Sequence, residues 1–412
     1  MIFNVSTSNI YIIASCSYWF IASLTFPILT LHFLEQGISI KEIGFAASLS
    51  AVIYVLLDIP LGAITDRVSK RYIFLISSLL HALGYIIWTI DSGIVTVVLA
   101  YSVWGAGRAF YSGVLESWFV NKIDSDNRST ITNKAFNYSS IGTSLAIASG
   151  VFVTGYLSQI SESSFASYYT ILKCAAIGMI LLGVFGFSFM TEIVIKKSNK
   201  RRNQKTNTPT LSRQISHAIV VLKNIRFSRY LFLSFAYGLC FGFFEVFWMP
   251  LGIDLNMTEF GVTVAYASAY LASSITLILL IRVKVKSNYE YWIPIVRSAF
   301  AISFLALSFT TSYIGFIISM LLIYVLSFIE APMIQTGLNE VIEDKSRALM
   351  LSCDSVVKQG VGIISGLVGA WVYETHGHQT ILMAISFLTL LSVVPYVYAQ
   401  RRAKRELNYT EN

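Results

Sequence analysis

The sequence consists largely of apolar segments, each about 20 residues long, which follow one another along the chain with short polar connections between them. Twenty residues of α-helix extend about 30 Å, the thickness of the hydrocarbon core of a bilayer. Only 13% of the 412 residues are charged, whereas soluble domains have about 25%. Such a chain cannot cover a water-facing surface with polar groups, so we predict an all-α integral membrane protein.

The chain is long enough for about twelve transmembrane helices with short loops. We predict spans at residues 9–33, 43–64, 72–90, 94–120, 135–157, 167–190, 230–250, 259–281, 289–310, 313–341, 347–373 and 379–400. Pro27 lies within the first span and should bend it, because proline removes a backbone donor. With an even number of spans, both ends of the chain lie on the same side of the membrane.

A polar and basic segment at residues 192–209 divides the chain, and a stretch with apolar residues at helical spacing, Ile215, Ile219 and Leu222, follows it. The second stretch is typical of an amphipathic helix at the membrane surface. We therefore predict an N-terminal six-helix half at residues 1–190, a cytoplasmic linker with an amphipathic helix at 191–229, and a C-terminal six-helix half with a basic tail at 230–412.

The two halves show a weak internal repeat. Arg128 and Gly150 in the first half have the same spacing as Arg347 and Gly369 in the second. Repeated halves are typical of transporters in which the halves rock about a site near the bilayer midplane. Chance similarity between apolar helices is the alternative interpretation.

The basic residues are unevenly distributed over the predicted topology. Most of the 30 Lys and Arg residues lie in connections on the side of the termini, whereas Lys41 lies in a connection on the other side. The positive-inside rule then places both termini and the linker in the cytoplasm. The net charge of +8 is explained by insertion and by contact with anionic lipid, so we expect no nucleic-acid partner.

The sequence lacks the motifs of an enzyme. It contains no phosphate-binding Gly-Lys-Ser/Thr loop and no Ser-His-Asp or Cys-His arrangement, and its four cysteines do not have the spacing of metal ligands. We therefore predict no catalytic activity, no cofactor and no metal site.

A charged hinge interrupts the apolar pattern between the second and third spans. Its residues Gly62, Asp66, Arg67, Lys70 and Arg71 follow the pattern Gly-x-x-x-Asp-Arg-x-x-Arg/Lys-Arg. This pattern resembles the signature between the second and third helices of the major facilitator superfamily. The resemblance implies a monomeric secondary transporter of the twelve-helix bacterial type in the inner membrane, with two six-helix repeat halves around a central cavity.

The resemblance also implies that the hinge is a conformational latch. Asp66 would lie at the start of the eleventh span, where an acid satisfies free backbone N–H groups and the helix dipole. Arg67 and Arg71 would pair with acids in the same layer, such as Asp58, and Gly62 would allow close helix contact. A loop that only determines the topology is the alternative.

Charged residues also lie inside the predicted spans, where charge is costly and commonly functional. The candidates for binding substrate and protons are Arg108, Glu116, Glu245 and Glu330, together with Trp104 and Trp248. In the superfamily the first, fourth, seventh and tenth helices line the cavity, so Arg108, Glu245 and Glu330 are expected to share it. A carboxyl group withdrawn from water exchanges protons closer to neutral pH. The alternative is that these charges pair and hold the halves together.

Three other polar residues in the spans are expected to be structural. His81 is expected to be a hydrogen-bonded packing residue, with proton relay as the alternative. Lys173 and Arg297 lie near predicted helix ends and are expected to extend their charged groups toward the surface.

The resemblance and the aromatic residues on the cavity helices favour proton-coupled export, by antiport, of a small amphiphilic compound such as a drug, toxin or antibiotic. The fifth-helix antiporter signature with Gly-Pro in mid-helix is absent, and residues 142–150 stand in its place. One alternative is proton-coupled uptake of a nutrient or an organic anion, with Arg108 as the anion partner. Another is a membrane sensor or anchor that transports nothing.

Overall fold

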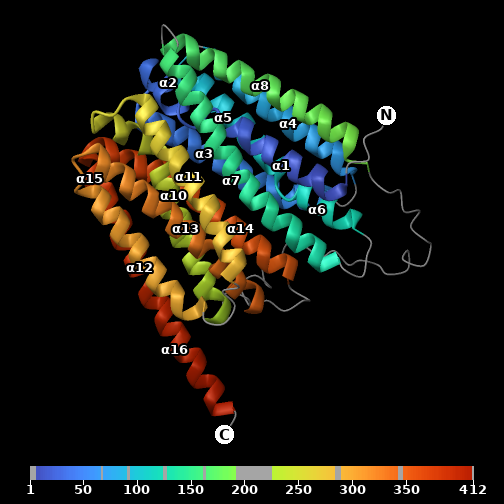
Figure 1. Ribbon diagram of the computed structural model, residues 1–412, viewed down its shortest axis with the longest axis vertical. Helices are drawn as coiled ribbons and strands as arrows, with labels where there is room; N and C mark the ends of the chain where they lie inside the picture. The colour runs from blue at the N-terminus through green and yellow to red at the C-terminus, as the bar shows by residue number, and fades with distance from the viewer. Residues whose placement is uncertain are drawn as a thin grey trace.

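The computed structural model describes residues 6–65, 68–90, 93–123, 128–160, 164–191, 225–283, 289–341 and 347–410, and the regular elements in this part of the chain are helices (Figure 1). The first half contains α1 (Thr7–Ser23), α2 (Leu29–Glu35), α3 (Ile40–Thr65), α4 (Lys70–Ile87), α5 (Ile94–Tyr111), α6 (Val114–Lys122), α7 (Arg128–Ile160) and α8 (Ser164–Phe189). The second half contains α10 (Ile225–Asp254), α11 (Glu259–Val283), α12 (Tyr289–Ser308), α13 (Tyr313–Val341), α14 (Arg347–Ile364), the π-helix η2 (Ser365–Gly369), α15 (Ala370–Leu391) and α16 (Val393–Thr410).

These helices form the twelve predicted spans. Ten stretches of the described helices are long and apolar enough to cross a membrane. One of them, Val357–Arg402, contains two spans, because Gly377 has φ 80° and breaks the helix within α15. The remaining span is the first, which is divided into α1 and α2. The prediction of an all-α membrane protein with twelve spans is confirmed.

Two of the spans are broken in the middle. α1 ends at Ser23 and α2 begins at Leu29, so the chain does bend at Pro27, as predicted. The fourth span is broken between α5 and α6 at Gly113, which has φ 65°. Glycine favours this left-handed conformation because it has no Cβ.

The halves are structural repeats. α3, α4, α5 and α7 begin at residues 40, 70, 94 and 128, and α11, α12, α13 and α14 begin at residues 259, 289, 313 and 347, each 219 residues later (259 − 40 = 219). By the same offset, the break at Gly113 corresponds to Pro332 inside α13. The repeat that the spacing of Arg128 and Arg347 predicts is therefore confirmed.

The predicted linker falls largely on residues 192–224, which lie outside the described residues, as does most of the expected amphipathic helix at 211–226. α8 ends at Phe189, and α10 begins at Ile225, five residues before the expected start of the seventh span.

The beginning of α1 and the end of α16 lie at one end of the bundle, which we name the terminal face, and α2 and the α15 kink lie at the other end, the distal face (Figure 1). At the distal face α3 packs against α14, η2 and α15 of the other half. Lys41 pairs with Glu374 (3.4 Å), and the Ser48 hydroxyl donates to the carbonyl of Ile363 (2.9 Å). Gly44 lies against the backbone of Gly366 with no space for a Cβ. The halves are therefore in direct contact on this side.

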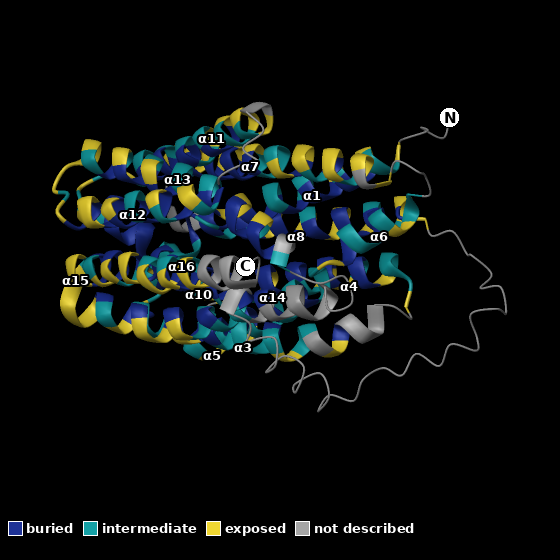
Figure 2. Ribbon diagram, turned by 90° about the horizontal axis from the view of Figure 1, so that it is seen from below, coloured by how far each residue is buried: buried dark blue, intermediate teal, exposed yellow. Residues whose placement is uncertain are grey.

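The burial pattern is that of a protein in lipid. Figure 2 shows buried residues in the interior of the bundle and exposed residues on its outer surface. Large apolar side chains such as Leu56, Val95, Leu181 and Phe387 are exposed there. An apolar outer surface of this extent is unfavourable in water but suits the hydrocarbon core of a bilayer.

Candidate substrate and proton site

A cavity of about 210 Å³ lies between the two halves, on the distal part of the bundle. The first half contributes residues of α2, α3 and α5, of the α1–α2 connection and of the end of α4 at Trp88, and the second half contributes residues of α10. Its lining consists of Thr25, Phe26, Leu29, Thr30, Ile43, Ala47, Trp88, Tyr101, Trp104, Glu245, Val246 and Trp248. The cavity therefore brings together three of the residues singled out from the sequence, Trp104, Glu245 and Trp248.

Glu245 is held in this cavity by neutral hydrogen-bond donors. The Tyr324 hydroxyl donates to its Oε1 (2.6 Å), and the Tyr266 hydroxyl donates to its Oε2 (3.1 Å). Among the described residues that line the cavity, none is Lys, Arg, His or a second acid. Two tyrosine hydroxyls orient the carboxyl group, but they do not neutralise a negative charge on it.

Aromatic rings surround this carboxyl group. Trp248 stacks on Tyr266, with ring centroids 4.0 Å apart and planes at 21°. The Tyr270 ring lies 5.1 Å from Tyr266 and 5.0 Å from Tyr324. Since these rings pack on one another, they fix the positions of the two hydroxyls that hold Glu245.

Arg108 lies next to the cavity, outside its described lining. Its guanidinium lies over the rings of Trp104 (5.1 Å) and Tyr54 (5.4 Å). Its Nη2 donates to Oε1 of Gln359 (3.2 Å), which belongs to α14 in the other half. Arg108 therefore contacts both halves and stacks on a tryptophan that lines the Glu245 cavity.

Glu330 is not where the resemblance places it. Nη1 of Arg297 donates to both of its carboxylate oxygens (2.8 and 2.9 Å) in an ion pair, and both side chains are 0% exposed. Arg297 also donates to the carbonyl of Leu233 (2.9 Å) and to Oγ of Ser392 (3.0 Å). Glu330 thus lies inside the second half, away from the cavity of Glu245, and the expectation of a cavity shared by both acids is wrong.

The expectation that Arg297 extends to the surface is also wrong, because its charge is compensated inside the bundle. It lies eight residues into α12, too deep for its side chain to reach the terminal face. Lys173 is exposed but lies nine residues into α8, so the extension of its charged group to the surface stays a prediction.

Glu116 and His81 lie in the first half, in separate surroundings. Glu116 lies near Tyr11 and Tyr111, and its Oε2 has no hydrogen-bond partner among the described residues. His81 Nδ1 bonds the carbonyl of Ser77 (2.8 Å), which can only accept, so Nδ1 carries the proton. Its Nε2 then accepts from the Tyr18 hydroxyl (2.9 Å). His81 is a buried packing residue with both nitrogens satisfied.

The hinge residues are described only in part. Asp66 and Arg67 lie outside the described residues, and Gly62 lies in α3 without described surroundings. The guanidinium of Arg71 lies over the rings of Tyr72 and Phe187, 5.1 Å from each. Asp58 lies beside Ser112, at the break of the fourth span. The expected pairing of these charges in a latch stays a prediction.

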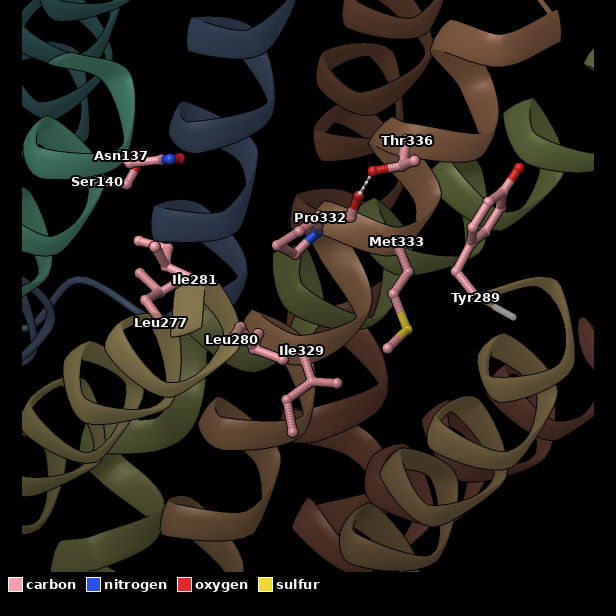
Figure 3. A pocket seen from close by; sticks show the side chains of 10 residues that line it. All are labelled: Asn137, Ser140, Leu277, Leu280, Ile281, Tyr289, Ile329, Pro332, Met333 and Thr336. Carbon is pink, nitrogen blue, oxygen red and sulfur yellow. Dashed lines mark hydrogen bonds between the residues drawn. The ribbon is translucent and has the colours of Figure 1, made fainter. Parts of the chain in front are cut away.

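A second pocket, of about 320 Å³, opens between the halves nearer the terminal face. Its described lining is Asn137, Ser140, Leu277, Leu280, Ile281, Tyr289, Ile329, Pro332, Met333 and Thr336. Figure 3 shows Asn137 and Ser140 on one side of this pocket and Pro332 and Thr336 on the other. No charged side chain is present in this described lining, in contrast to the Glu245 cavity.

Comparison with known proteins identifies the family. The profile of the Major Facilitator Superfamily matches residues 11–338, most of the chain. The chain belongs to the major facilitator superfamily. It is accordingly a multi-pass membrane protein and a secondary transporter of a small molecule, and not an enzyme.

The relatives share the family but only a small part of the sequence. The uncharacterized MFS-type transporter YxaM of Bacillus subtilis (strain 168) is 18% identical over 372 residues, 90% of each chain. The uncharacterized MFS-type transporter YdeE of Escherichia coli (strain K12) is 21% identical over 162 residues, which span 39% of this chain and 40% of that one. Neither name specifies a substrate.

Solved structures show the same fold. The nucleoside transporter NupG has a TM-score of 0.72 at 13% identity, over 96% of this chain and 99% of that one. A POT family transporter in complex with 5-aminolevulinic acid has a TM-score of 0.74 at 12% identity, over 96% of each chain. At these identities the likeness concerns the fold alone.

The sequence does not single out Tyr266 and Tyr324, the two residues whose hydroxyls bond Glu245. Tyr266 lies on the eighth span, which the resemblance does not place at the cavity. Tyr324 belongs to the aromatic residues of the cavity helices, but the sequence does not distinguish it from the others. Tyr266 and Tyr270 are four residues apart, so they lie on one face of α11. A pair of tyrosines on one face of an apolar span was the available signal.

Proposed function

We propose that the protein is a proton-coupled antiporter that exports a small amphiphilic compound, and that proton and substrate compete for Glu245. The observation that carries this proposal is the Glu245 carboxyl group, which lies in a cavity between the halves and whose hydrogen-bond partners among the described residues are two neutral tyrosine hydroxyls. Buried charges in membrane spans are costly and are retained where they bind ions or substrates.

The partners of Glu245 support a change of protonation during transport. When protonated, the group is neutral and needs no counter-charge. When deprotonated, it carries a negative charge that Tyr266 and Tyr324 can hydrogen-bond but cannot neutralise. If proton binding to Glu245 displaces the substrate, and substrate binding displaces the proton, one group is enough for obligatory exchange.

The contacts between the halves support alternating access. Gly44, Ser48 and Lys41 hold α3 against the other half at the distal face, and the second pocket lies between the halves toward the terminal face. The excess of Lys and Arg around the termini supports a cytoplasmic terminal face, and the bacterial relatives support the inner, cytoplasmic membrane. In this arrangement the protein is closed to the outside.

The hinge latch is proposed to act on the terminal face. Asp66, Arg67 and Arg71, with Gly62 and Asp58, would stabilise the state in which the halves are closed on the cytoplasmic side. The small-residue contact of Gly44 with Gly366 would be its counterpart on the distal side.

Proton-coupled uptake of an organic anion is a second candidate function, favoured by Arg108. Among the described residues its polar partner is the neutral amide of Gln359, and two aromatic rings flank it. An anion at Arg108 would gain a charge-assisted hydrogen bond there.

The test is proton movement in proteoliposomes loaded with a pH-sensitive dye. A panel of amphiphilic amines, neutral drugs and small organic anions is added under an imposed pH gradient. We expect one class to dissipate the gradient with wild-type protein and not with Glu245→Gln. Glu259→Gln, an acid at the distal start of α11, is the matched control and should behave as wild type. Equal proton movement by wild type and Glu245→Gln for every active compound would overturn the proposal.

A further inference from the structure

We infer that the Glu245 cavity binds a small organic monocation, with the carboxylate as its counter-ion and indole rings as its walls. This inference rests on the proposed role of Glu245 and specifies the substrate class of the same site. Three properties of the cavity support it: its charge, its aromatic walls and its size.

The charge of the cavity has one sign. Glu245 is the only acid in the described lining, which contains no base. The titratable groups described around it are tyrosines: Tyr266 and Tyr270 on α11, Tyr324 on α13, Tyr237 on its own helix, and Tyr101 across the cavity. The guanidinium of Arg108 lies outside this lining, over Trp104, and donates to Gln359. A cationic ligand would supply the missing counter-charge, whereas an anionic ligand would be repelled at short range in a medium of low dielectric constant.

The walls favour a cation over a neutral molecule. Trp88, Trp104 and Trp248 line the cavity with Phe26 and Tyr101. Indole faces attract ammonium groups, and the attraction is larger where water is excluded. Trp104 has the guanidinium of Arg108 over its ring, so this indole already takes part in a cation–π contact in the structure.

The size and remaining polarity of the cavity restrict the ligand further. Pockets for drug-sized ligands commonly measure about 300–1,000 Å³, and this cavity measures about 210 Å³. Trp88 is 2% exposed, and its Nε1–H donor has no hydrogen-bond partner among the described residues. The ligand class is therefore a small amine or quaternary ammonium compound with an aromatic or alkyl body, and an acceptor group on it would satisfy Trp88.

The contact between Trp248 and Tyr266 connects the wall to the carboxylate. Because Trp248 stacks on the ring whose hydroxyl bonds Glu245, a cation against Trp248 lies close to the negative charge. The two attractions thus act on the same ligand group.

The experiment is a binding titration of purified protein, followed by tryptophan fluorescence, with a protein-free micelle titration subtracted. The probes are phenyltrimethylammonium, its neutral carbon isostere tert-butylbenzene, and the anion benzenesulfonate. We expect the cation to bind at least about tenfold more tightly than the isostere and the anion not to bind. Cation affinity should rise with pH, because protons compete for Glu245, and Glu245→Gln should lose both the preference and the pH dependence.

Equal affinity for cation and isostere, or an unchanged cation preference in Glu245→Gln, would overturn the inference. Trp104→Phe keeps an aromatic wall and should weaken cation binding less than Trp104→Ala. The result is separable from the proposed function: proton exchange that depends on Glu245 without cation preference refutes only the ligand class. Cation binding at Glu245 without coupled proton movement refutes only the antiport.

Discussion

Glu245 and Glu330 are both buried acids of the second half, yet their partners differ completely. Glu330 is matched by Arg297 in an ion pair from which water is excluded. Glu245 has two tyrosine hydroxyls and faces a cavity between the halves. A permanent counter-charge stabilises the ionised form of a buried carboxyl group. Without a counter-charge, the buried group is stabilised by binding a proton or a cation. Under the proposed function, Glu330 therefore stabilises the fold and Glu245 takes part in transport.

The largest expected effect is on stability, from breaking the Arg297–Glu330 pair. Glu330→Gln or Arg297→Met leaves one buried charge without its partner, which costs about 3–5 kcal/mol. We expect both variants to unfold at much lower temperature or to aggregate, as measured by thermal unfolding in detergent and size-exclusion chromatography. Wild-type thermal stability in either variant would remove the distinction between the two acids.

The double variant Arg297→Met/Glu330→Leu is the matched control for that experiment. Replacing a buried ion pair with apolar groups of similar size is often neutral or stabilising. We therefore expect the double variant to regain most of the lost thermal stability. If the double variant is as unstable as the single ones, the hydrogen bonds from Arg297 to Leu233 and Ser392 contribute more to stability than the ion pair does.

The next effect concerns function with little change in stability. Glu245→Gln keeps the side-chain volume and an oxygen that can accept from Tyr266 and Tyr324. Its free energy of unfolding should change by less than about 1 kcal/mol, the size of one neutral hydrogen bond, while its substrate-dependent proton movement is lost. Thermal unfolding and proton flux measured on one preparation check this, and a large loss of stability would place Glu245 in the same class as Glu330.

The smallest effects come from single hydrogen bonds to each charged group. Ser392→Ala removes an acceptor of Arg297 and should lower stability by about 1 kcal/mol without altering transport. Tyr324→Phe removes the 2.6 Å bond to Glu245 and should raise the substrate KM several-fold. Thermal unfolding and transport are measured on both variants. A transport defect in Ser392→Ala, or a loss of stability without a transport defect in Tyr324→Phe, would contradict the different roles of the two acids.

Much of the fold follows from the sequence because apolar length is a strong constraint in a bilayer. The twelve spans, the break at Pro27 and the repeat of Arg128 and Arg347 depend on local composition and spacing. The division of the fourth span at Gly113 was not predicted, because glycine next to Ser112 can also continue a helix. In the structure Gly113 has φ 65°, which the residue type permits but does not require.

The site was harder to predict because charge pairing depends on depth and on helix rotation. Glu330 and Glu245 look alike in sequence, each being a lone acid among apolar residues. Arg297 lies eight residues from the end of α12 at the terminal face, and Glu330 lies eleven residues from the corresponding end of α13. Their similar depths indicate that the two charges can pair. The rotation of α11 that turns Tyr266 toward Glu245 depends on contacts with other helices. The spacing of residues within α11 does not predict this rotation.

Proton flux in proteoliposomes separates the two acids, when Glu245→Gln and Arg297→Met/Glu330→Leu are compared at equal reconstituted amounts. We expect the double variant, in which Glu330 is absent, to retain substrate-coupled proton movement and Glu245→Gln to have none. Coupling that survives in Glu245→Gln, or that disappears in a folded double variant, would contradict this expectation.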